Sequence, residues 1–308
     1  MKIVFAGTPE FAVKPLRALI DGGYDVVAAI TQTDKPTGRK ATLTPSPVAR
    51  CAEEAGVPVF KFEKIRNCVE DVKNIGADVM ITCAYGQILS QQILDIFPLG
   101  VWNAHASLLP EFRGASPIQS AILAGKRQTG VTIMKTELAM DSGDMLLVKK
   151  CDIAEGETYG ELSEKLSSLA AEAVSEAAAL IEKGDTATIL QDDSAATYCK
   201  KISKADGKVN FEKTAGEVAR LINAMDPSPA AYCNFNGSIV NLFKASPCEY
   251  GQNNAVFGQV VSVAKNGIVI KCKDGCVNVA EAQFAGGKRL KAADILNGRK
   301  LSAGDRLD

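Results

Sequence analysis

The alternation of short apolar runs with amphipathic segments over the first hundred residues most constrains the fold of this chain. Continuous apolar runs of strand length occupy residues 2–6, 24–30, 57–60, 78–83 and 101–104. Helical patterns lie between them, at 11–20, 47–55, 69–75 and 91–96. Continuous apolar runs are typical of strands buried on both faces, and the intervening helices supply crossovers between parallel strands. The sequence therefore predicts an α/β fold with a doubly wound, Rossmann-like parallel sheet.

Helix-start signals recur along the chain and place further elements. Ser46 and Ser116 each precede a proline, which is the pattern of an N-cap followed by a first helical residue. Thr158 and Thr214 are each followed three residues later by glutamate, which predicts two capping boxes. The first should open a long helix that ends near Lys183, and two further strands are expected at 129–135 and 145–149.

The pattern changes after Leu190, where the chain becomes polar and mixed in charge. Short strands are then predicted at 231–235, 238–243, 257–263, 267–272 and 277–284, separated by Asn-Gly and Asp-Gly turns. About five short strands favour a small β-barrel. We therefore predict a first domain over 1–190, a linker over 191–207 and a C-terminal β-barrel domain over 208–308.

Composition favours a cytoplasmic, globular protein. The chain is 46% hydrophobic and 23% charged over 308 residues, and no apolar run reaches membrane-spanning length. Its nine cysteines are scattered without a Cys-x-x-Cys pair, which predicts free thiols and no metal site. Residues 200–308 carry 16 Lys and Arg against 10 Asp and Glu, whereas the rest carries 19 against 26. The basic C-terminal third hints at a polyanionic partner.

Polar residues at the end of the run at 101–104 are the candidate for chemistry. His105 is the only histidine of the chain, and Asn103 lies two residues before it. Residues two apart on a strand share a face, so an amide and an imidazolium could both donate to one oxygen, as in an oxyanion site. Asp141, in a glycine-containing turn, could pair with the imidazole. A buried, hydrogen-bonded core histidine is the alternative.

Two further observations narrow the reaction class. The first turn, Gly7-Thr-Pro-Glu-Phe-Ala12, has proline at the second glycine position of GxGxxG, which disfavours a nicotinamide dehydrogenase. No GxSxG motif is present and no cysteine neighbours His105, so direct acyl-type transfer between two bound substrates is favoured over a covalent enzyme intermediate.

The long polar loop at 31–47, with Lys35, Arg39 and Lys40, predicts a contact role.

Several motifs together resemble the 10-formyltetrahydrofolate-dependent formyltransferases. They are Asn103-Ala-His105-Ala-Ser107-Leu-Leu-Pro110, Arg113-Gly-Ala-Ser-Pro-Ile118, Gly130-Val-Thr-Ile133 and Asp141-Ser-Gly-Asp144. The opening Ile3–Ala12, the loop Pro36–Arg39 and the run Pro45–Val48 narrow the resemblance to the members that act on methionyl-tRNA. The resemblance covers essentially the whole chain.

The resemblance implies roles residue by residue. Asn103, His105 and Asp141 match the catalytic trio of the family. Ser107, Leu108, Leu109 and Pro110 match its folate-contacting segment. Gln87, Ile88 and Leu89 match the loop that lines its pterin pocket. Arg39, followed by Lys40, matches the arginine of a loop that enters the acceptor stem of initiator tRNA, although Lys40-Ala-Thr replaces the usual second glycine and lysines. The C-terminal barrel would be an OB-like tRNA-binding domain.

The resemblance also implies the reaction and its partners. We expect a monomeric, metal-free enzyme that transfers the formyl group of 10-formyltetrahydrofolate to the α-amine of initiator methionyl-tRNA, with no membrane partner. Family members that act on a sugar nucleotide or on glycinamide ribonucleotide, and a formyltetrahydrofolate hydrolase, are alternatives that share the trio. A non-catalytic tRNA- or nucleotide-binding protein that retains the fold is a further alternative. The intact trio argues against it, because a binding protein does not need all three residues.

Overall fold

The computed structural model describes residues 1–37, 42–249, 251 and 254–308. The chain forms two compact units. The first comprises Met1–Pro117, Gln128–Asp152 and Ser163–Lys200, and the second comprises Ile118–Arg127, Ile153–Leu162 and Lys201–Asp308. Gln191–Lys200, the first part of the predicted linker, is thus grouped with the first unit. No helix of the described residues is long and apolar enough to cross a membrane.

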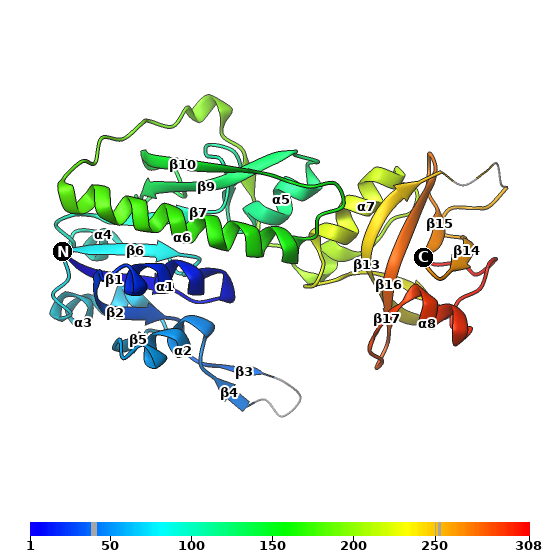
Figure 1. Cartoon of the computed structure of the whole chain (residues 1–308), viewed down its shortest axis with the longest axis horizontal. Helices are drawn as coiled ribbons and strands as arrows, with labels where there is room; N and C mark the ends of the chain where they lie inside the picture. The colour runs from blue at the N-terminus through cyan, green and yellow to red at the C-terminus, as the bar shows by residue number, and fades with distance from the viewer. Residues whose placement is uncertain (38–41, 250, 252–253) are drawn as a thin grey trace. The chain divides into compact units, whose positions relative to one another are not determined.

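A seven-stranded sheet forms the centre of the first unit (Figure 1), in the order β10-β9-β7-β6-β1-β2-β5. The five parallel strands are β1 (Lys2–Gly7), β2 (Asp25–Thr31), β5 (Val59–Lys61), β6 (Val79–Cys83) and β7 (Val101–His105). The antiparallel strands β9 (Gln128–Lys135) and β10 (Met145–Asp152) extend the sheet beyond β7. The doubly wound α/β prediction is confirmed, with an antiparallel edge added.

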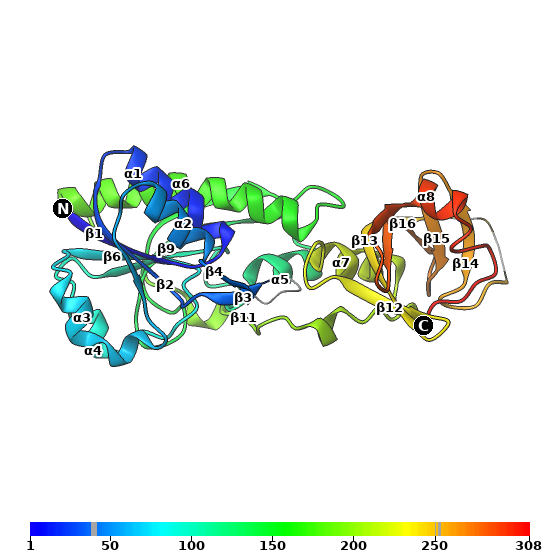
Figure 2. The ribbon, with the colours of Figure 1, turned by 90° about the horizontal axis from the view of Figure 1, so that it is seen from below.

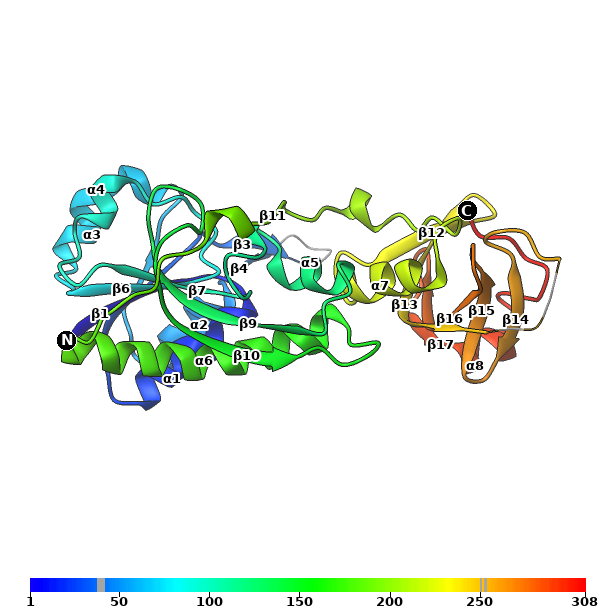
Figure 3. The same ribbon diagram turned by 90° about the horizontal axis from the view of Figure 1, so that it is seen from above.

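Helices cover both faces of this sheet, as the views from below and above show (Figures 2 and 3). Helices α1 (Val13–Asp21) and α6 (Tyr159–Lys183) lie on one face, and α3 (Val69–Asn74) and α4 (Gln91–Leu94) lie on the other. Helix α2 (Pro47–Glu54) begins at the predicted cap, where the Ser46 side chain accepts a hydrogen bond from the Ala49 amide at 3.1 Å. The predicted Thr158–Glu161 box opens α6.

The strand order creates a topological switch point. The chain starts in the middle of the sheet at β1, proceeds through β2 and β5 to one edge, and returns to the other side of β1 at β6. In open α/β sheets, ligands bind outside the carboxyl ends of the strands near such a point. The polar residues that end β6 and β7 lie at this edge.

Two segments of the first unit differ from the prediction. Within the predicted loop at 31–47, β3 (Lys35–Thr37) pairs antiparallel with β4 (Thr42–Thr44). Lys35, Pro36 and 42–44 are exposed or half-buried, so hydrophobic alternation does not reveal these short strands. Within the predicted linker, β11 (Tyr198–Cys199) pairs with β8 (Arg113–Gly114), which precedes α5 (Pro117–Leu123).

The second unit contains an antiparallel sheet in the order β12-β13-β16-β15-β14, with β17 on β16. These strands are β12 (Ala231–Phe235), β13 (Ser238–Cys248), β14 (Val260–Ala264), β15 (Gly267–Lys271), β16 (Cys276–Phe284) and β17 (Arg289–Lys291). The sheet packs on α7 (Ala215–Ala224), which begins at the predicted Thr214–Glu217 capping box, and on α8 (Ala292–Asn297). The prediction of a C-terminal domain built from short β-strands is confirmed, and these strands form an antiparallel sheet.

Candidate active site

Strand β7, which lies between β6 and β9 in the sheet, carries Asn103 and His105. Asn103 is in register with Thr82 of β6, and His105 with Thr132 of β9. Because side chains alternate along a strand, both residues face the same side of the sheet. His105 is 5% exposed, so it is buried at the end of the strand.

The Asn103 amide is oriented by a buried hydroxyl. Thr82 Oγ1 donates a hydrogen bond to Asn103 Oδ1 at 2.8 Å, and Thr82 is 6% exposed. Since the amide oxygen accepts this bond, the Nδ2 end of Asn103 is left as a donor. Sequence reasoning assigned no role to Thr82, because its neighbours on β6 form an ordinary apolar strand.

Both ring nitrogens of His105 face oxygen atoms. Nε2 is 3.0 Å from the carbonyl oxygen of Phe112, and Nδ1 is 3.7 Å from Asp141 Oδ2. A carbonyl oxygen only accepts, so Nε2 is the donor in its contact with Phe112, and the Asp141 carboxylate lies beside Nδ1. The structure thus brings His105 and Asp141 together, as predicted, at a distance longer than a direct hydrogen bond.

Asp141 is held in an unusual backbone conformation. Its φ is +50°, in the left-handed region that non-glycine residues adopt at a cost. Its Oδ2 accepts a hydrogen bond from the Gly114 amide at 2.8 Å, and its carbonyl accepts one from Gln191 Nε2 at 2.9 Å. A strained residue tied at both its side chain and its backbone is typical of a functional site.

Two glycines allow the close backbone approaches around Asp141. A Cβ on Gly143 would lie 1.9 Å from the Lys135 carbonyl oxygen. A Cβ on Gly114, whose φ is +121°, would lie 2.2 Å from the Cys199 carbonyl oxygen. Any side chain at either position would push the Asp141 turn or the β8–β11 pair apart.

The segment predicted to contact folate is tied to β9 through one hydroxyl. Thr132 Oγ1 donates to the Ser107 carbonyl at 2.7 Å and accepts from the Leu109 amide at 3.3 Å. Ser107 Oγ donates to the Glu111 carbonyl at 2.6 Å. Ser107 and Leu109 are buried and Leu108 and Pro110 are half-buried, so the latter two are the more accessible members of this segment.

The other predicted folate segment follows β6. Gln87 uses both ends of its amide on backbone: Oε1 accepts from the Ile65 amide and Nε2 donates to the Phe62 carbonyl, each at 2.8 Å. Leu89 is buried, whereas the side chain of Ile88 is 76% exposed. Ile88 is therefore the member of this segment whose apolar side chain is open to solvent.

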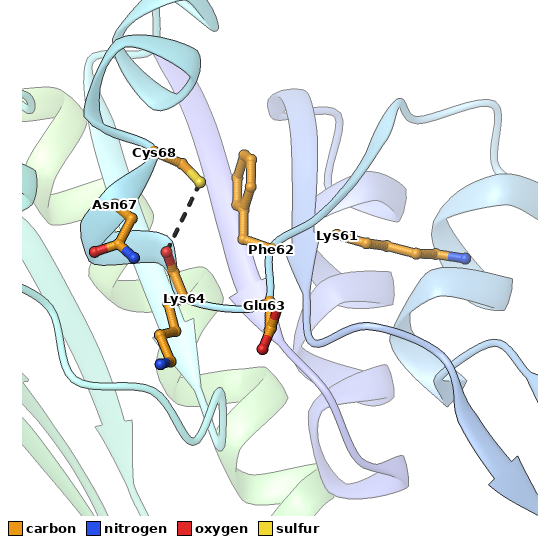
Figure 4. Close-up of a pocket in the computed structure, with 6 residues that line it drawn as sticks. All are labelled: Lys61, Phe62, Glu63, Lys64, Asn67 and Cys68. Carbon is orange, nitrogen blue, oxygen red and sulfur yellow. Dashed lines mark hydrogen bonds between the residues drawn. The ribbon is translucent and has the colours of Figure 1, made fainter.

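A cavity of about 360 Å³ lies beside the backbone that Gln87 braces (Figure 4). Its lining contains none of the predicted catalytic or binding residues. In Figure 4 the Cys68 thiol points to the Lys64 carbonyl, 3.7 Å away, and the Lys61 side chain extends away from the others. The lining residues are Lys61, Phe62, Glu63, Lys64, Asn67 and Cys68.

Arg39 and Lys40, the two predicted tRNA contacts, lie outside the residues that the structure describes. Over residues 1–37, 42–249, 251 and 254–308, no group of three or more His, Cys, Asp or Glu side chains is arranged to hold a metal ion. All nine cysteines are free thiols, as predicted. Burial raises the pKa of Cys83, at the end of β6, to about 12.

Comparison with known proteins identifies the family. The family described as "Formyl transferase" matches residues 1–178, and "Formyl transferase, C-terminal domain" matches residues 201–300. The chain belongs to the formyl transferase family. The family resemblance drawn from Asn103-Ala-His105 and its companion motifs is therefore confirmed.

Relatives within the family match the chain over its whole length. A methionyl-tRNA formyltransferase of Ruminiclostridium cellulolyticum is 39% identical, over 100% of this chain and 99% of its own length. That of Chromobacterium violaceum is 43% identical over the same shares. The similarity thus extends through both units, including the C-terminal β domain.

Solved structures share the fold at low sequence identity. Methionyl-tRNA formyltransferase from Clostridium thermocellum has a TM-score of 0.57 and 16% identity, covering 83% of this chain and 95% of that one. HypX from Aquifex aeolicus in complex with tetrahydrofolic acid has a TM-score of 0.66 and 18% identity, covering 96% of this chain and 47% of that one. At these identities the similarity establishes the fold alone.

Proposed function

We propose that this protein transfers the formyl group of 10-formyltetrahydrofolate to the α-amine of methionyl-tRNA, for translation initiation. The observation that carries the proposal is the full-length similarity, at 39% and 43% identity, to two methionyl-tRNA formyltransferases. It includes the C-terminal unit, which contains none of the three proposed catalytic residues. The family membership supports a folate as the formyl carrier.

In the proposed reaction, the neutral α-amine first forms a bond to the formyl carbon, and the bond from that carbon to N10 of the folate then breaks. One proton leaves the amine and one is gained by N10. A free α-amine titrates near about 7.7–8.0, so a usable neutral fraction exists at pH 7. Negative charge develops on the formyl oxygen between the two steps, and this oxygen is what the enzyme must stabilise.

Asn103 and His105 supply the donors for that oxygen in this proposal. The Thr82 bond to Oδ1 leaves Asn103 Nδ2 available to donate. Nε2 of His105 lies within hydrogen-bond distance of Phe112, so Nδ1, which stands 3.7 Å from Asp141, is the ring nitrogen better suited to the second donor role. Asp141 orients the protonated ring and, through a water, carries the amine proton toward N10.

The binding roles are part of the same proposal. Ser107–Pro110 and Gln87–Leu89 would contact the folate, with Leu108, Pro110 and Ile88 as its accessible members. Arg39 and Lys40, together with the second unit, would contact the tRNA. A monomeric state and a cytoplasmic location remain predictions.

A comparison of acceptors tests the proposal. The purified protein is incubated with 10-formyltetrahydrofolate and, in parallel, initiator methionyl-tRNA, an amino-sugar nucleotide or glycinamide ribonucleotide, and formylated product is measured. We expect product with methionyl-tRNA. Transfer only to one of the small acceptors would overturn the choice of acceptor while keeping the reaction, and release of formate without transfer would indicate a hydrolase.

The Arg39→Ala variant tests the tRNA role separately. We expect it to raise KM for methionyl-tRNA or slow transfer to it, while KM for the folate stays within about twofold, because a phosphate contact acts on the tRNA alone. A variant that loses folate binding instead would contradict the assignment.

A further inference from the structure

The segment Gln191–Cys199 forms hydrogen bonds with both residues whose oxygen atoms face His105, although it was predicted to be the start of a linker. Gln191 Nε2 donates to the carbonyls of Asp141 and Gly143, at 2.9 and 2.7 Å. Thr197 Oγ1 accepts from the Phe112 amide at 2.8 Å. Phe112 supplies the carbonyl, and Asp141 the carboxylate, that stand beside the two ring nitrogens of His105.

Gln191 is itself held firmly. The buried guanidinium of Arg113, 2% exposed, donates to Gln191 Oε1 from Nε at 3.0 Å and from a terminal nitrogen at 2.8 Å. Arg113 also pairs with Asp193 at 2.7 Å. Burial opposes the charge, but the hydrogen bonds to Asp193 and Tyr198 outweigh it and raise the pKa of Arg113. The fork of Arg113 therefore fixes the Gln191 amide in one orientation.

The chemistry of this position requires an amide. One end of the side chain must accept from a guanidinium, and the other must donate to two carbonyl oxygens. Glutamine carries both an acceptor and two donor hydrogens at its tip, whereas glutamate only accepts and lysine only donates. Gln191 thus satisfies the hydrogen-bonding groups on both sides of it, which a residue of an exposed linker would not have to do.

The opposite end of the segment holds Phe112 in a similar way. Phe112 has a φ of +57°. Besides the Thr197 bond, the Cys199 thiol donates to the Phe112 carbonyl at 3.4 Å, and the Arg113 amide donates to the Thr197 carbonyl at 2.9 Å. Both residues that flank the imidazole, Phe112 and Asp141, therefore have left-handed backbones that the same segment ties in place.

We propose that Gln191 and Thr197 are positioning residues for the reaction, and that they act by fixing Asp141 and Phe112 around the His105 ring. The proposal rests on the proposed function for its kinetic consequences, but not for its geometry. A shift of about 1 Å in a group that orients a reacting residue can lower a rate by about 10²-fold. Loss of either contact should therefore affect the chemical step more than substrate binding.

Two substitutions and one control test this. Gln191→Glu keeps the acceptor for Arg113 and removes the donors to the Asp141 turn. Thr197→Val keeps the shape and removes the acceptor for Phe112. Asp192→Asn is the control, because Asp192 caps its own turn by accepting from the Ser194 amide and hydroxyl, which asparagine can also do.

The measurements exploit the single histidine. Because the chain has one His, nitrogen-15 NMR of the imidazole gives one pair of ring signals, which report the surroundings of His105 without assignment work. We expect Gln191→Glu and Thr197→Val to shift these signals and to lower kcat by about 10–100-fold, with KM for both substrates within about twofold. Asp192→Asn should change neither, and all variants should keep a cooperative thermal transition.

The outcomes separate the two proposals. Ring signals and kcat that stay at wild-type values in both Gln191→Glu and Thr197→Val would overturn the positioning role. Equal shifts in the Asp192→Asn control would overturn it too, since the effect would not be specific to the two contacts. Ring signals that move only in the two variants, in a protein that does not formylate methionyl-tRNA, would support the positioning role and reject the proposed function.

Discussion

Asn103 and Asp141 belong to two parts of the candidate site, a strand half on β7 and a turn half after β9, and obtain their positions in different ways. Asn103 lies on β7, whose register with β6 brings Thr82 beside it. Asp141 lies in an irregular turn, with φ at +50°, held by Gly114 and Gln191 from distant parts of the chain. The strand half is rigid because the sheet fixes it, whereas the turn half depends on a few hydrogen bonds. Loss of one hydrogen bond should therefore lower kcat more on the turn half than on the strand half.

The largest effects are expected from removing the proposed donors. Asn103→Ala and His105→Ala should each lower kcat for formyl transfer by about 10²–10³-fold, which is typical for loss of one oxyanion donor. Steady-state kinetics with saturating folate and methionyl-tRNA measures this. A variant that retains near-wild-type turnover would remove that residue from the mechanism.

Asp141→Asn tests the turn half directly. The substitution keeps the shape and an acceptor for the Gly114 amide but removes the negative charge beside His105. We expect kcat to fall by about 10²-fold, because the carboxylate no longer orients and stabilises the protonated ring. The matched control is Asp144→Asn in the same turn, whose carboxylate accepts from the Thr188 hydroxyl at 3.2 Å. Equal losses in both variants would indicate damage to the turn rather than a specific role of Asp141.

Thr82→Val removes the hydroxyl that orients Asn103 but leaves β6 and β7 paired. A neutral hydrogen bond contributes about 0.5–1.5 kcal/mol, so we expect kcat to fall by up to about tenfold. KM values should hardly change. If Thr82→Val lowered kcat as much as Asn103→Ala, the strand half would depend on side-chain contacts as strongly as the turn half, contrary to the comparison.

The smallest effect is expected at the capping box of α6, a feature fixed by local sequence. The Thr158 amide and hydroxyl hold the pKa of Glu161 below its usual value of 4.5. A carboxylate with a lowered folded-state pKa stabilises the fold above the unfolded value and loses that contribution as pH falls through the folded value. Urea unfolding should show Glu161→Gln less stable than wild type at pH 7.

The difference should be under about 1 kcal/mol, because Glu161 is half exposed and solvent screens it. It should disappear in acid, below the folded-state pKa of Glu161. At pH 7 the variant should keep the wild-type kcat, because the box lies outside the His105 cluster. A stability difference that grew on acidification would contradict the assigned direction of the pKa shift.

Features with a local sequence signal were predicted well. The five apolar runs became the parallel strands, and Ser46, Thr158 and Thr214 cap helices at the expected positions. A strand buried on two faces and a cap bonded to an amide three residues away both leave a pattern within a short window. The β3–β4 hairpin was missed because its polar residues carry no such pattern.

Contacts within the site were predicted only in part. The sequence placed Asn103 and His105 on one face and proposed Asp141 as a partner, and the structure puts His105 and Asp141 3.7 Å apart. It gave no indication of Thr82, 21 residues before Asn103, or of Gln191, 50 residues after Asp141. Hydrogen bonds across such separations follow no sequence period. A threonine in an apolar strand and a glutamine in a polar stretch therefore do not stand out in the sequence.

The sequence by itself determined the layers of the fold, the helix starts and the candidate residues for the chemistry. It did so because burial periodicity, caps and residue type are local properties. Only the tertiary structure decided how those residues are held: Thr82 beside Asn103, Gly114 and Gln191 around Asp141, and the 191–199 segment folded back onto the first unit. Those positions follow from sheet register and from polar groups that must find partners when buried, and both depend on the whole fold.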